Sequence, residues 1–236
     1  MARLTHMARE GKAPDGRSSR WDAHREVRRA ELVDAAVRAI DAHGPDVGVA
    51  SIAAEAGVSK PVLYRYFADK DELYAAVGQW GADEVMDRLL AAILTEASVR
   101  DRVERGVDAY LGAIEEHPNV FLLLVRHRTG HGDPLADGKA RIAATFARVL
   151  GDTLRELGVD AAGAEPWAEG LVGLGLATGE WWLSRQTMTR TAVGRYLTAF
   201  VFHALEGTAA ELGVPLSALD APGLVPDSVS PITRRS

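Results

Sequence analysis

The chain has 236 residues, no cysteine and a formal net charge of −6 at pH 7. Hydrophobic residues make up 47% of it, enough for a substantial core, which excludes a globally disordered protein. The lack of cysteine excludes disulfides, thiolate metal sites and cysteine nucleophiles. No apolar run is long enough to span a membrane, and none follows the N-terminal arginines as in a secretory signal. We therefore expect a cytoplasmic protein with no membrane partner.

The charge is unevenly distributed. Residues 1–80 carry 12 Lys or Arg and 12 Asp or Glu, whereas residues 81–236 carry 15 and 21, so the net negative charge belongs to the second part. Residues 1–29 alone hold eight basic and four acidic side chains. Local charge near phosphate governs affinity for nucleic acid, so the acidic total does not exclude DNA binding.

The first 20 residues are polar and rich in Gly, Arg and Ser, which predicts a flexible basic tail. One interpretation is a solvated terminus. The other is an arm that brings Arg17 or Arg20 to phosphate or into the minor groove. We favour the solvated terminus, with a modest electrostatic role.

A long helix is expected from about Asp22 to Ala42, ended by His43-Gly44-Pro45. Three arginines lie near its start, and they either touch the DNA backbone or form a solvated face; they are Arg25, Arg28 and Arg29.

Residues 51–70 read as two short helices joined by a tight Gly-Val-Ser turn, the spacing of a helix-turn-helix. We expect Ser51 to cap the first helix and Gly57 to end it. Ser59 then caps the second helix, with Pro61 in its first turn, where a missing N–H has no cost.

The second of these helices has an unusual outer surface. Leu63 and Phe67 are four residues apart and face inward. The remaining side chains include two cations and two tyrosines, which a helix in a DNA major groove uses and a globular core does not. They are Lys60, Val62, Tyr64, Arg65 and Tyr66.

The run Ile52–Ser59 followed by Leu63–Leu73 resembles the TetR family of bacterial transcriptional regulators, and the resemblance covers about residues 25–80. It implies an all-α fold. An N-terminal three-helix helix-turn-helix DNA-binding domain, residues 21–68, is followed by a larger helical effector-binding and dimerisation domain, residues 69–212, and a loose tail, residues 213–236. The competing interpretation of residues 51–70 is an ordinary helical hairpin within a bundle.

Within the helix-turn-helix, two roles in DNA binding are expected. Base reading is assigned to Lys60, Pro61, Val62, Tyr64 and Arg65. Anchoring to the DNA backbone is assigned to Ser51, Ser59, Tyr66 and Lys70, the last as the resemblance implies.

A fourth helix is expected to begin at the capping residue Asp69 and to leave the DNA-binding domain for the larger one, so that it links the two mechanically. The rest of the chain predicts helices at about 100–116, 118–127, 137–157, 163–185 and 190–212.

The glycine-rich segment 170–182 lacks a preceding strand and a following Lys-Ser/Thr, so it is not a nucleotide loop. Its small residues favour a helix that another helix approaches closely, and in the TetR-like architecture the last two long helices form a homodimer interface. We expect one face with Trp167, Leu171, Leu174, Thr178 and Trp181, and another with Val172, Leu176 and Leu183. The ligand-binding candidates are Tyr110, Phe121, Arg126, Phe146, Trp167, Leu174, Thr178, Trp181 and Trp182.

A second cluster comprises His117, Arg126, His127, Arg128 and His131. A metal site, a basic mouth for an acidic ligand and simple solvated charge are the three interpretations, and we favour solvated charge. We expect no metal and no cofactor. No set of nucleophile, base and orienting group emerges, so we do not expect an enzyme.

The sequence thus predicts a homodimeric transcriptional repressor that binds a palindromic DNA operator and is released by a small, mostly apolar effector. A fatty acid or acyl-CoA is the candidate effector. One alternative is an activator or partner-recruiting module without an effector. Another is a helical binding protein or enzyme in which the helix-turn-helix is inert.

Overall fold

The computed structural model describes residues 16–127 and 132–220, and within these ranges the chain is helical with no strand. The expected all-α fold is confirmed. The N-terminal head consists of α1 (Gly16–His43), α2 (Val49–Glu55) and α3 (Lys60–Leu63). The larger domain consists of α4 (Lys70–Ile93), α5 (Val99–Glu116), α6 (Pro118–Arg126), α7 (Ala136–Glu156), α8 (Ala164–Arg185), α9 (Arg190–Glu211) and the 3₁₀ helix η1 (Leu216–Asp220).

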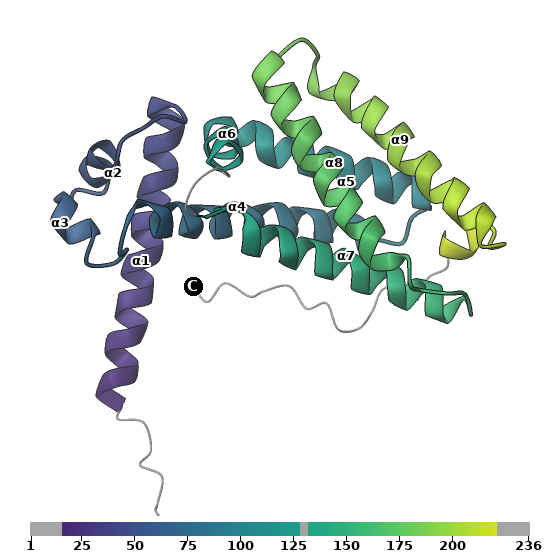
Figure 1. Cartoon of the computed structure of the whole chain (residues 1–236), viewed down its shortest axis with the longest axis horizontal. Coiled ribbons are helices and arrows are strands. Elements are labelled where there is room, and N and C mark those ends of the chain that lie inside the picture. The colour runs from purple at the N-terminus through teal and green to yellow at the C-terminus, as the bar shows by residue number, and fades with distance from the viewer. Residues whose placement is uncertain (1–15, 128–131, 221–236) are drawn as a thin grey trace, which may run out of the picture.

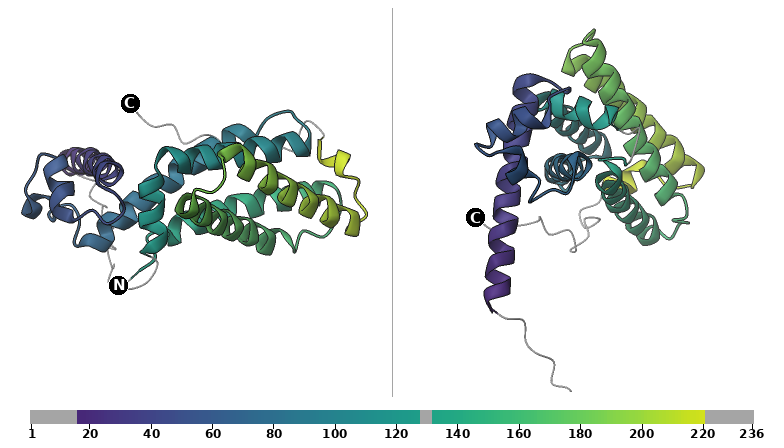
Figure 2. Two further views of the ribbon diagram at one scale, coloured as in Figure 1. Left: turned by 90° about the horizontal axis from the view of Figure 1, so that it is seen from above. Right: turned by 60° about the vertical axis from the view of Figure 1, so that its left-hand side comes forward.

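The molecule is elongated, with the head at one end (Figures 1 and 2). Helix α1 runs across the start of α4, and α4 continues from the head into the larger domain, where it packs against α5 and α7 (Figure 1). Helix α8 packs against α7 and helix α9 against α5, and α6 lies at the head end of the bundle (Figures 1 and 2). Helix α4 is therefore the link between head and larger domain that the sequence predicts.

Most helix boundaries agree with the sequence to within one or two residues, because Pro and Gly mark them. Gly44 and Gly57 adopt positive φ, +90° and +64°, and end α1 and α2, as expected. The five helices from α5 to α9 begin and end within one residue of their predicted limits.

Three expectations need correction. Helix α1 begins at Gly16 and not near Asp22, so the predicted tail loses residues 16–20, and residues 1–15 lie outside the described part. Gly48, with extended φ and ψ of −83° and 153°, takes the N-cap position of α2, so Ser51 lies inside that helix and does not cap it. Residues 216–220 of the predicted loose tail form η1, where the Asp220 carboxylate accepts a hydrogen bond from the Val99 backbone N–H at 2.6 Å.

The core of the head continues into the larger domain. Its buried side chains include Leu32, Ile40, Ile52 and Phe67, and the same cluster contains α6 residues such as Leu123. Because each of these side chains is removed from water, the head and α6 are held together by the hydrophobic effect. No helix in the described ranges combines the length and apolar character that a membrane span requires.

Candidate functional site

The turn between α2 and α3 has the geometry of a helix-turn-helix. The backbone N–H of Val58 donates to the Ala53 carbonyl at 2.9 Å, which closes α2 over the left-handed residue Gly57. Ser59 occupies the N-cap position of α3 with extended backbone, although its side chain makes no capping hydrogen bond. Pro61 lies in the first turn of α3, as predicted.

Helix α3 is anchored on one side and open on the other. Leu63 and Phe67 are 0% and 1% exposed, so they fix the rotation of the helix about its axis. Of the predicted base-reading residues, Val62 is half-buried and the other four are exposed: Lys60, Pro61, Tyr64 and Arg65. Among the described residues neither Lys60 nor Arg65 forms an ion pair, so both charges face solvent.

The residues predicted to anchor the DNA backbone come from α2, from the two ends of the α3 segment and from the start of α4. Ser51 on α2 and Ser59 are exposed, and Tyr66 is half-buried after α3. Lys70 begins α4, where its Nζ lies 4.8 Å from the centroid of the Tyr74 ring. Three of these four residues are exposed and Tyr66 is half-buried, so their polar groups lie at or near the protein surface.

The carbonyls at the end of the α3 segment are satisfied by α1. Arg29 Nη1 donates to the Tyr66 carbonyl at 2.6 Å, and Arg25 Nη2 to the Arg65 carbonyl at 3.5 Å. The guanidinium of Arg29 also stacks over the Phe67 ring, 4.3 Å from its centroid. Arg29 therefore has a defined partner within the head, whereas Arg28 pairs with Glu31 on its own helix.

Glu72 completes this network. One of its oxygens accepts from Arg29 Nη1 at 2.8 Å, and the other accepts from the Ala68 backbone N–H at 2.6 Å. The Ala68 N–H and then the Arg29 guanidinium hold the pKa of Glu72 below its ordinary value. Asp69 caps α4 as predicted, since its carboxylate accepts from the Glu72 backbone N–H at 2.8 Å. Helices α1 and α4 and the end of α3 are thus joined by charged hydrogen bonds.

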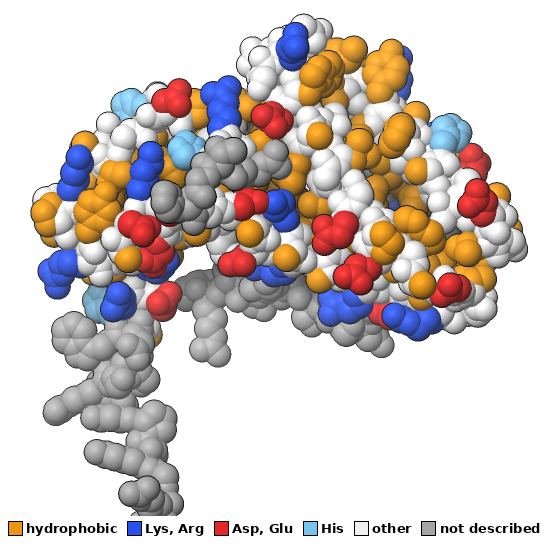
Figure 3. Space-filling model, viewed as in Figure 1, with side chains coloured by type: hydrophobic (Ala, Val, Ile, Leu, Met, Phe, Trp, Pro, Cys, Tyr) orange, Lys and Arg blue, Asp and Glu red, His pale blue; other side chains and the backbone are white. Residues whose placement is uncertain are grey.

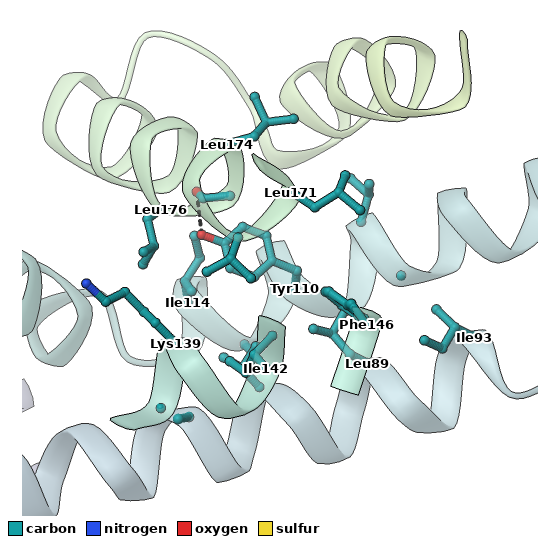
Figure 4. Close-up of a pocket in the computed structure, with 18 of the residues that line it drawn as sticks. Leu89, Ile93, Tyr110, Ile114, Lys139, Ile142, Phe146, Leu171, Leu174 and Leu176 are labelled. Carbon is teal, nitrogen blue, oxygen red and sulfur yellow. Dashed lines mark hydrogen bonds between the residues drawn. The ribbon is translucent and has the colours of Figure 1, made fainter. Parts of the chain in front are cut away.

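The larger domain contains a cavity of about 360 Å³, bordered by residues of all six helices from α4 to α9 (Figure 4). Its walls are mainly aliphatic and aromatic, as Leu89, Ile93, Ile142 and Phe146 show in Figure 4. The volume lies at the small end of the range for ligand pockets, roughly 300–1,000 Å³. An apolar molecule fits the chemistry of these walls.

Few polar groups reach the cavity. The Tyr110 hydroxyl donates to the Gly175 carbonyl at 2.6 Å, so its hydrogen bond is made within the protein (Figure 4). Burial raises the pKa of Tyr110 well above its ordinary range. Lys139 on α7 also borders the cavity and forms an ion pair with Asp133.

Four of the nine predicted ligand-binding residues line the cavity: Tyr110, Phe121, Phe146 and Leu174. The other five, Arg126, Trp167, Thr178, Trp181 and Trp182, do not. Arg126 is exposed, and Trp181 is 43% exposed on the outside of α8. Trp182 is buried in another cluster and donates its indole N–H to the Met188 carbonyl at 2.9 Å.

The two expected faces of α8 are not separated as predicted. Leu171 and Leu174 come from one face and Val172 and Leu176 from the other, yet all four border the cavity. Trp80 on α4 and His117 after α5 also line it, although neither was predicted as a ligand contact. Trp80 lies in a stretch that resembles any core helix, so periodicity alone did not distinguish it, and His117 lies among charged and polar residues that do not indicate a cavity wall.

The two histidines of the basic cluster that the structure describes have different partners. His117 Nδ1 lies 2.6 Å from Asp41 Oδ2, whereas His127 Nδ1 lies 2.9 Å from the Leu123 carbonyl. Arg128 and His131 lie outside the described residues. Within the described part of the chain, no three His, Asp or Glu side chains converge as metal ligands would.

A third surface is formed by α8 and α9. Hydrophobic side chains gather on the part of the surface that these helices form (Figure 3). Trp181, Tyr196 and Phe200 are 43%, 58% and 65% exposed. An exposed cluster of large aromatic side chains is typical of a protein–protein interface.

Comparisons with known protein families agree with this geometry. The family model for bacterial regulatory proteins of the tetR family matches residues 32–77, which span the helix-turn-helix. A model described as a tetracyclin repressor-like C-terminal domain matches residues 88–216, most of the larger domain.

Individual relatives agree as well. An uncharacterised HTH-type transcriptional regulator of Mycobacterium tuberculosis is 34% identical over 196 residues, which is 82% of this chain and 83% of that protein. The HTH-type transcriptional activator FasR of Mycolicibacterium smegmatis is 32% identical over 163 residues, 68% of this chain and 74% of that protein.

Solved structures share the fold. A TetR-family regulator from Streptomyces coelicolor superposes with a TM-score of 0.64 at 24% identity, covering 84% of this chain and 90% of that one. FadR from Bacillus subtilis, in complex with stearoyl-CoA, superposes with a TM-score of 0.57 at 16% identity, covering 72% of this chain and 95% of that one. The family is one of DNA-binding transcriptional regulators and not of enzymes. By both family models and by these relatives, the chain belongs to the TetR family of bacterial transcriptional regulators.

Proposed function

We propose that the protein is a homodimeric repressor that binds a palindromic DNA operator and is released by an apolar effector held in the cavity. One observation carries this proposal. Helix α4 begins beside the exposed basic surface of α3 and then forms a wall of the cavity, so the same rigid element touches both sites. A ligand that binds one state of α4 better than another shifts the head by that difference in affinity.

In this proposal α3 enters the major groove. Arg65 reads guanine, Val62 or Pro61 meets a thymine methyl, and Lys60 and Tyr64 make further base contacts. Ser51, Ser59, Tyr66 and Lys70 hold the phosphates. Two heads would read half-sites one helical turn apart, about 34–36 Å.

The dimer forms, in this proposal, through α8 and α9. Tyr196 and Phe200 are four residues apart and share one exposed face of α9. On α8, Gly170 and Gly173 are exposed, and a Cβ added at either would meet no atom of the same chain within 4 Å. Small residues beside exposed aromatics allow a second copy to pack closely, so a four-helix interface is the arrangement we propose.

The effector we propose has a long hydrocarbon chain, as in a fatty acid or an acyl-CoA. The cavity walls are aliphatic over α4, α5 and α7, and a structural relative of this fold, FadR, is known in complex with stearoyl-CoA. Burial of each methylene contributes about 0.8 kcal/mol to the binding free energy, so an apolar cavity favours long hydrocarbon chains over short ones.

The experiment that tests this proposal measures effector and DNA together. Palmitate and stearoyl-CoA are titrated into the protein, and binding is followed by calorimetry. The same ligands are then added to the protein bound to a fluorescent operator duplex. The proposal predicts stoichiometric binding and a fall in operator affinity. Binding without any change in operator affinity would contradict release by the effector.

An activator is the second candidate. FasR, a relative that is 32% identical over 163 residues, is named a transcriptional activator. Transcription in vitro from a promoter that carries the operator distinguishes the two candidates, because a repressor lowers the amount of transcript and an activator raises it.

A further inference from the structure

Helix α6 separates the cavity from the head. Val120 and Leu124 of α6 line the cavity. The same two side chains belong to the hydrophobic cluster that contains Ile40 and Leu63 of the head. A change in the shape of the cavity at α6 therefore acts directly on the packing of the head, because packed interiors transmit displacement rather than absorb it.

A polar contact lies beside this packing. His117, the residue before α6, borders the cavity, and its Nδ1 is 2.6 Å from Oδ2 of Asp41 on α1. On its other side the His117 ring meets Trp80 edge to face, with centroids 5.0 Å apart. Trp80 also lines the cavity. A chain of contacts thus runs from the cavity through Trp80 and His117 to the head.

Only one of the two carboxylate oxygens of Asp41 has a hydrogen-bond partner among the described residues. Its Oδ2 accepts from His117 and its backbone carbonyl accepts from the Asn119 side chain at 3.0 Å. Its other carboxylate oxygen, Oδ1, is buried and has no hydrogen-bond partner among the described residues. Leaving a buried oxygen unpaired costs free energy, so other arrangements of this carboxylate are close in energy to the one seen. A contact of this kind changes readily when a neighbour moves.

We propose that the Asp41–His117 pair is the positioning contact through which the cavity controls the head. A hydrocarbon chain packed against Trp80 displaces the His117 ring, the pair separates, and α1 reorients relative to α6. Asp41 lies on α1 and His117 lies between α5 and α6, so neither belongs to α3 or to the residues that we propose to contact DNA. The proposal rests on the proposed function for the ligand, and it adds the residues that transmit its binding.

The test compares four proteins: the wild type, Asp41→Ala, the exchanged double variant Asp41→His with His117→Asp, and the control Glu116→Gln. Glu116 precedes His117 in the chain, and its Oε2 forms an ion pair with Arg88 at 2.6 Å, within the larger domain alone. For each protein, affinity for the operator duplex is measured by anisotropy with and without stearoyl-CoA, and stearoyl-CoA affinity is measured by calorimetry.

Allosteric couplings commonly change affinity by about 5–150-fold. We expect the wild type and Glu116→Gln to lose at least about fivefold in operator affinity when stearoyl-CoA binds. Asp41→Ala should bind stearoyl-CoA equally well but change operator affinity less than about twofold, and the exchanged pair should restore part of the response. A purely structural role would lower thermal stability without abolishing the response. A full response in Asp41→Ala would overturn the proposal.

Failure of the proposed effector is distinguishable from failure of the coupling. If stearoyl-CoA does not bind the wild type, the effector assignment is wrong. Operator affinity without ligand then decides the coupling. A shift in Asp41→Ala of more than about threefold, absent in Glu116→Gln, supports a contact that sets the position of the head. Equal affinity in both variants overturns it.

Discussion

Arg29 Nη1 lies 2.6 Å from the backbone carbonyl of Tyr66, so an arginine of the first helix caps the end of the α3 segment, whose exposed side chains we propose to read DNA. Carbonyls at a helix end lack partners within the helix, and a cation there is also favoured by the helix dipole. The position of α3 thus depends on α1 through a group that need not touch DNA.

Replacing Arg29 with Gln should weaken operator binding without removing a DNA contact. Charged hydrogen bonds of this kind contribute about 1.5–3 kcal/mol, so we expect operator affinity to fall roughly tenfold or more. The control is Arg28→Gln, whose guanidinium pairs only with Glu31 on the same exposed face in the described structure. Fluorescence anisotropy with one operator duplex measures the operator affinity of both variants. Equal losses in the two variants would mean that Arg29 acts only through long-range charge.

Glu72 makes the stability of the head dependent on pH. Its pKa is held below the ordinary 4.5, so the folded state binds a proton less readily than the unfolded chain. The stabilising effect is complete well above pH 4.5 and is lost as pH falls through the folded-state pKa. Glu72→Gln should therefore have a lower urea midpoint than the wild type near neutral pH, and this difference should shrink in acid. Glu31→Gln serves as the control, and a difference for Glu72→Gln that grows in acid would contradict this assignment.

Arg65 and Lys70 should affect DNA binding differently. Under the proposed function Arg65 contacts a base, so Arg65→Ala should cost about 1–3 kcal/mol and relax specificity at one base position. Lys70→Ala should weaken binding to all sequences alike. It should also reduce the slope of log affinity against log salt concentration by about one. Competition between the operator and its single-base variants measures the affinity and the base specificity of each protein variant, and a salt series measures the slope. Uniform weakening by both substitutions would contradict the division into reading and anchoring residues.

Gly179 on α8 is required by the close approach of α5. A Cβ at this position would lie 2.6 Å from the Tyr110 hydroxyl oxygen and 2.9 Å from side-chain carbons of Ile114 and Phe121. Overpacking costs about 1–3 kcal/mol, so Gly179→Ala should lower the thermal midpoint despite the better helix propensity of alanine.

The matched control for that substitution is Gly81→Ala on α4. An added Cβ there meets only Leu124 Cδ1, at an ordinary 3.8 Å, so stability should be unchanged or higher. Tyr110→Phe removes the oxygen that the added Cβ of Gly179→Ala would approach too closely. The decreases in thermal midpoint caused by the two substitutions should therefore not add in the double variant. Full additivity would show that the hydroxyl is not the obstacle.

Local signals in the sequence predicted much of this structure. The helix-turn-helix follows from Gly57, Ser59 and Pro61, whose backbone preferences act within a few residues. The limits of the later helices follow in the same way from prolines and glycines. Local rules were less informative at the start of α2, where Gly48 and Ser51 are both acceptable N-caps and only the folded chain selects between them.

The sites between distant elements were harder to predict. Trp80, Trp181 and Trp182 look alike on helices, yet one lines the cavity, one faces solvent and one is buried elsewhere. The Asp41–His117 contact joins residues 76 positions apart, and the Arg29–Tyr66 contact joins residues 37 apart. Such pairs depend on tertiary packing, which helical periodicity does not encode.

The most direct test of the central claim is selection of bound duplexes from a random DNA library, followed by anisotropy with the enriched sequence across a salt series. We predict a palindrome bound by two protomers, with half-sites about one helical turn apart and affinity that falls steeply as salt rises. Failure to enrich any sequence, together with an affinity that does not respond to salt, would contradict the proposal that this chain is an operator-binding regulator.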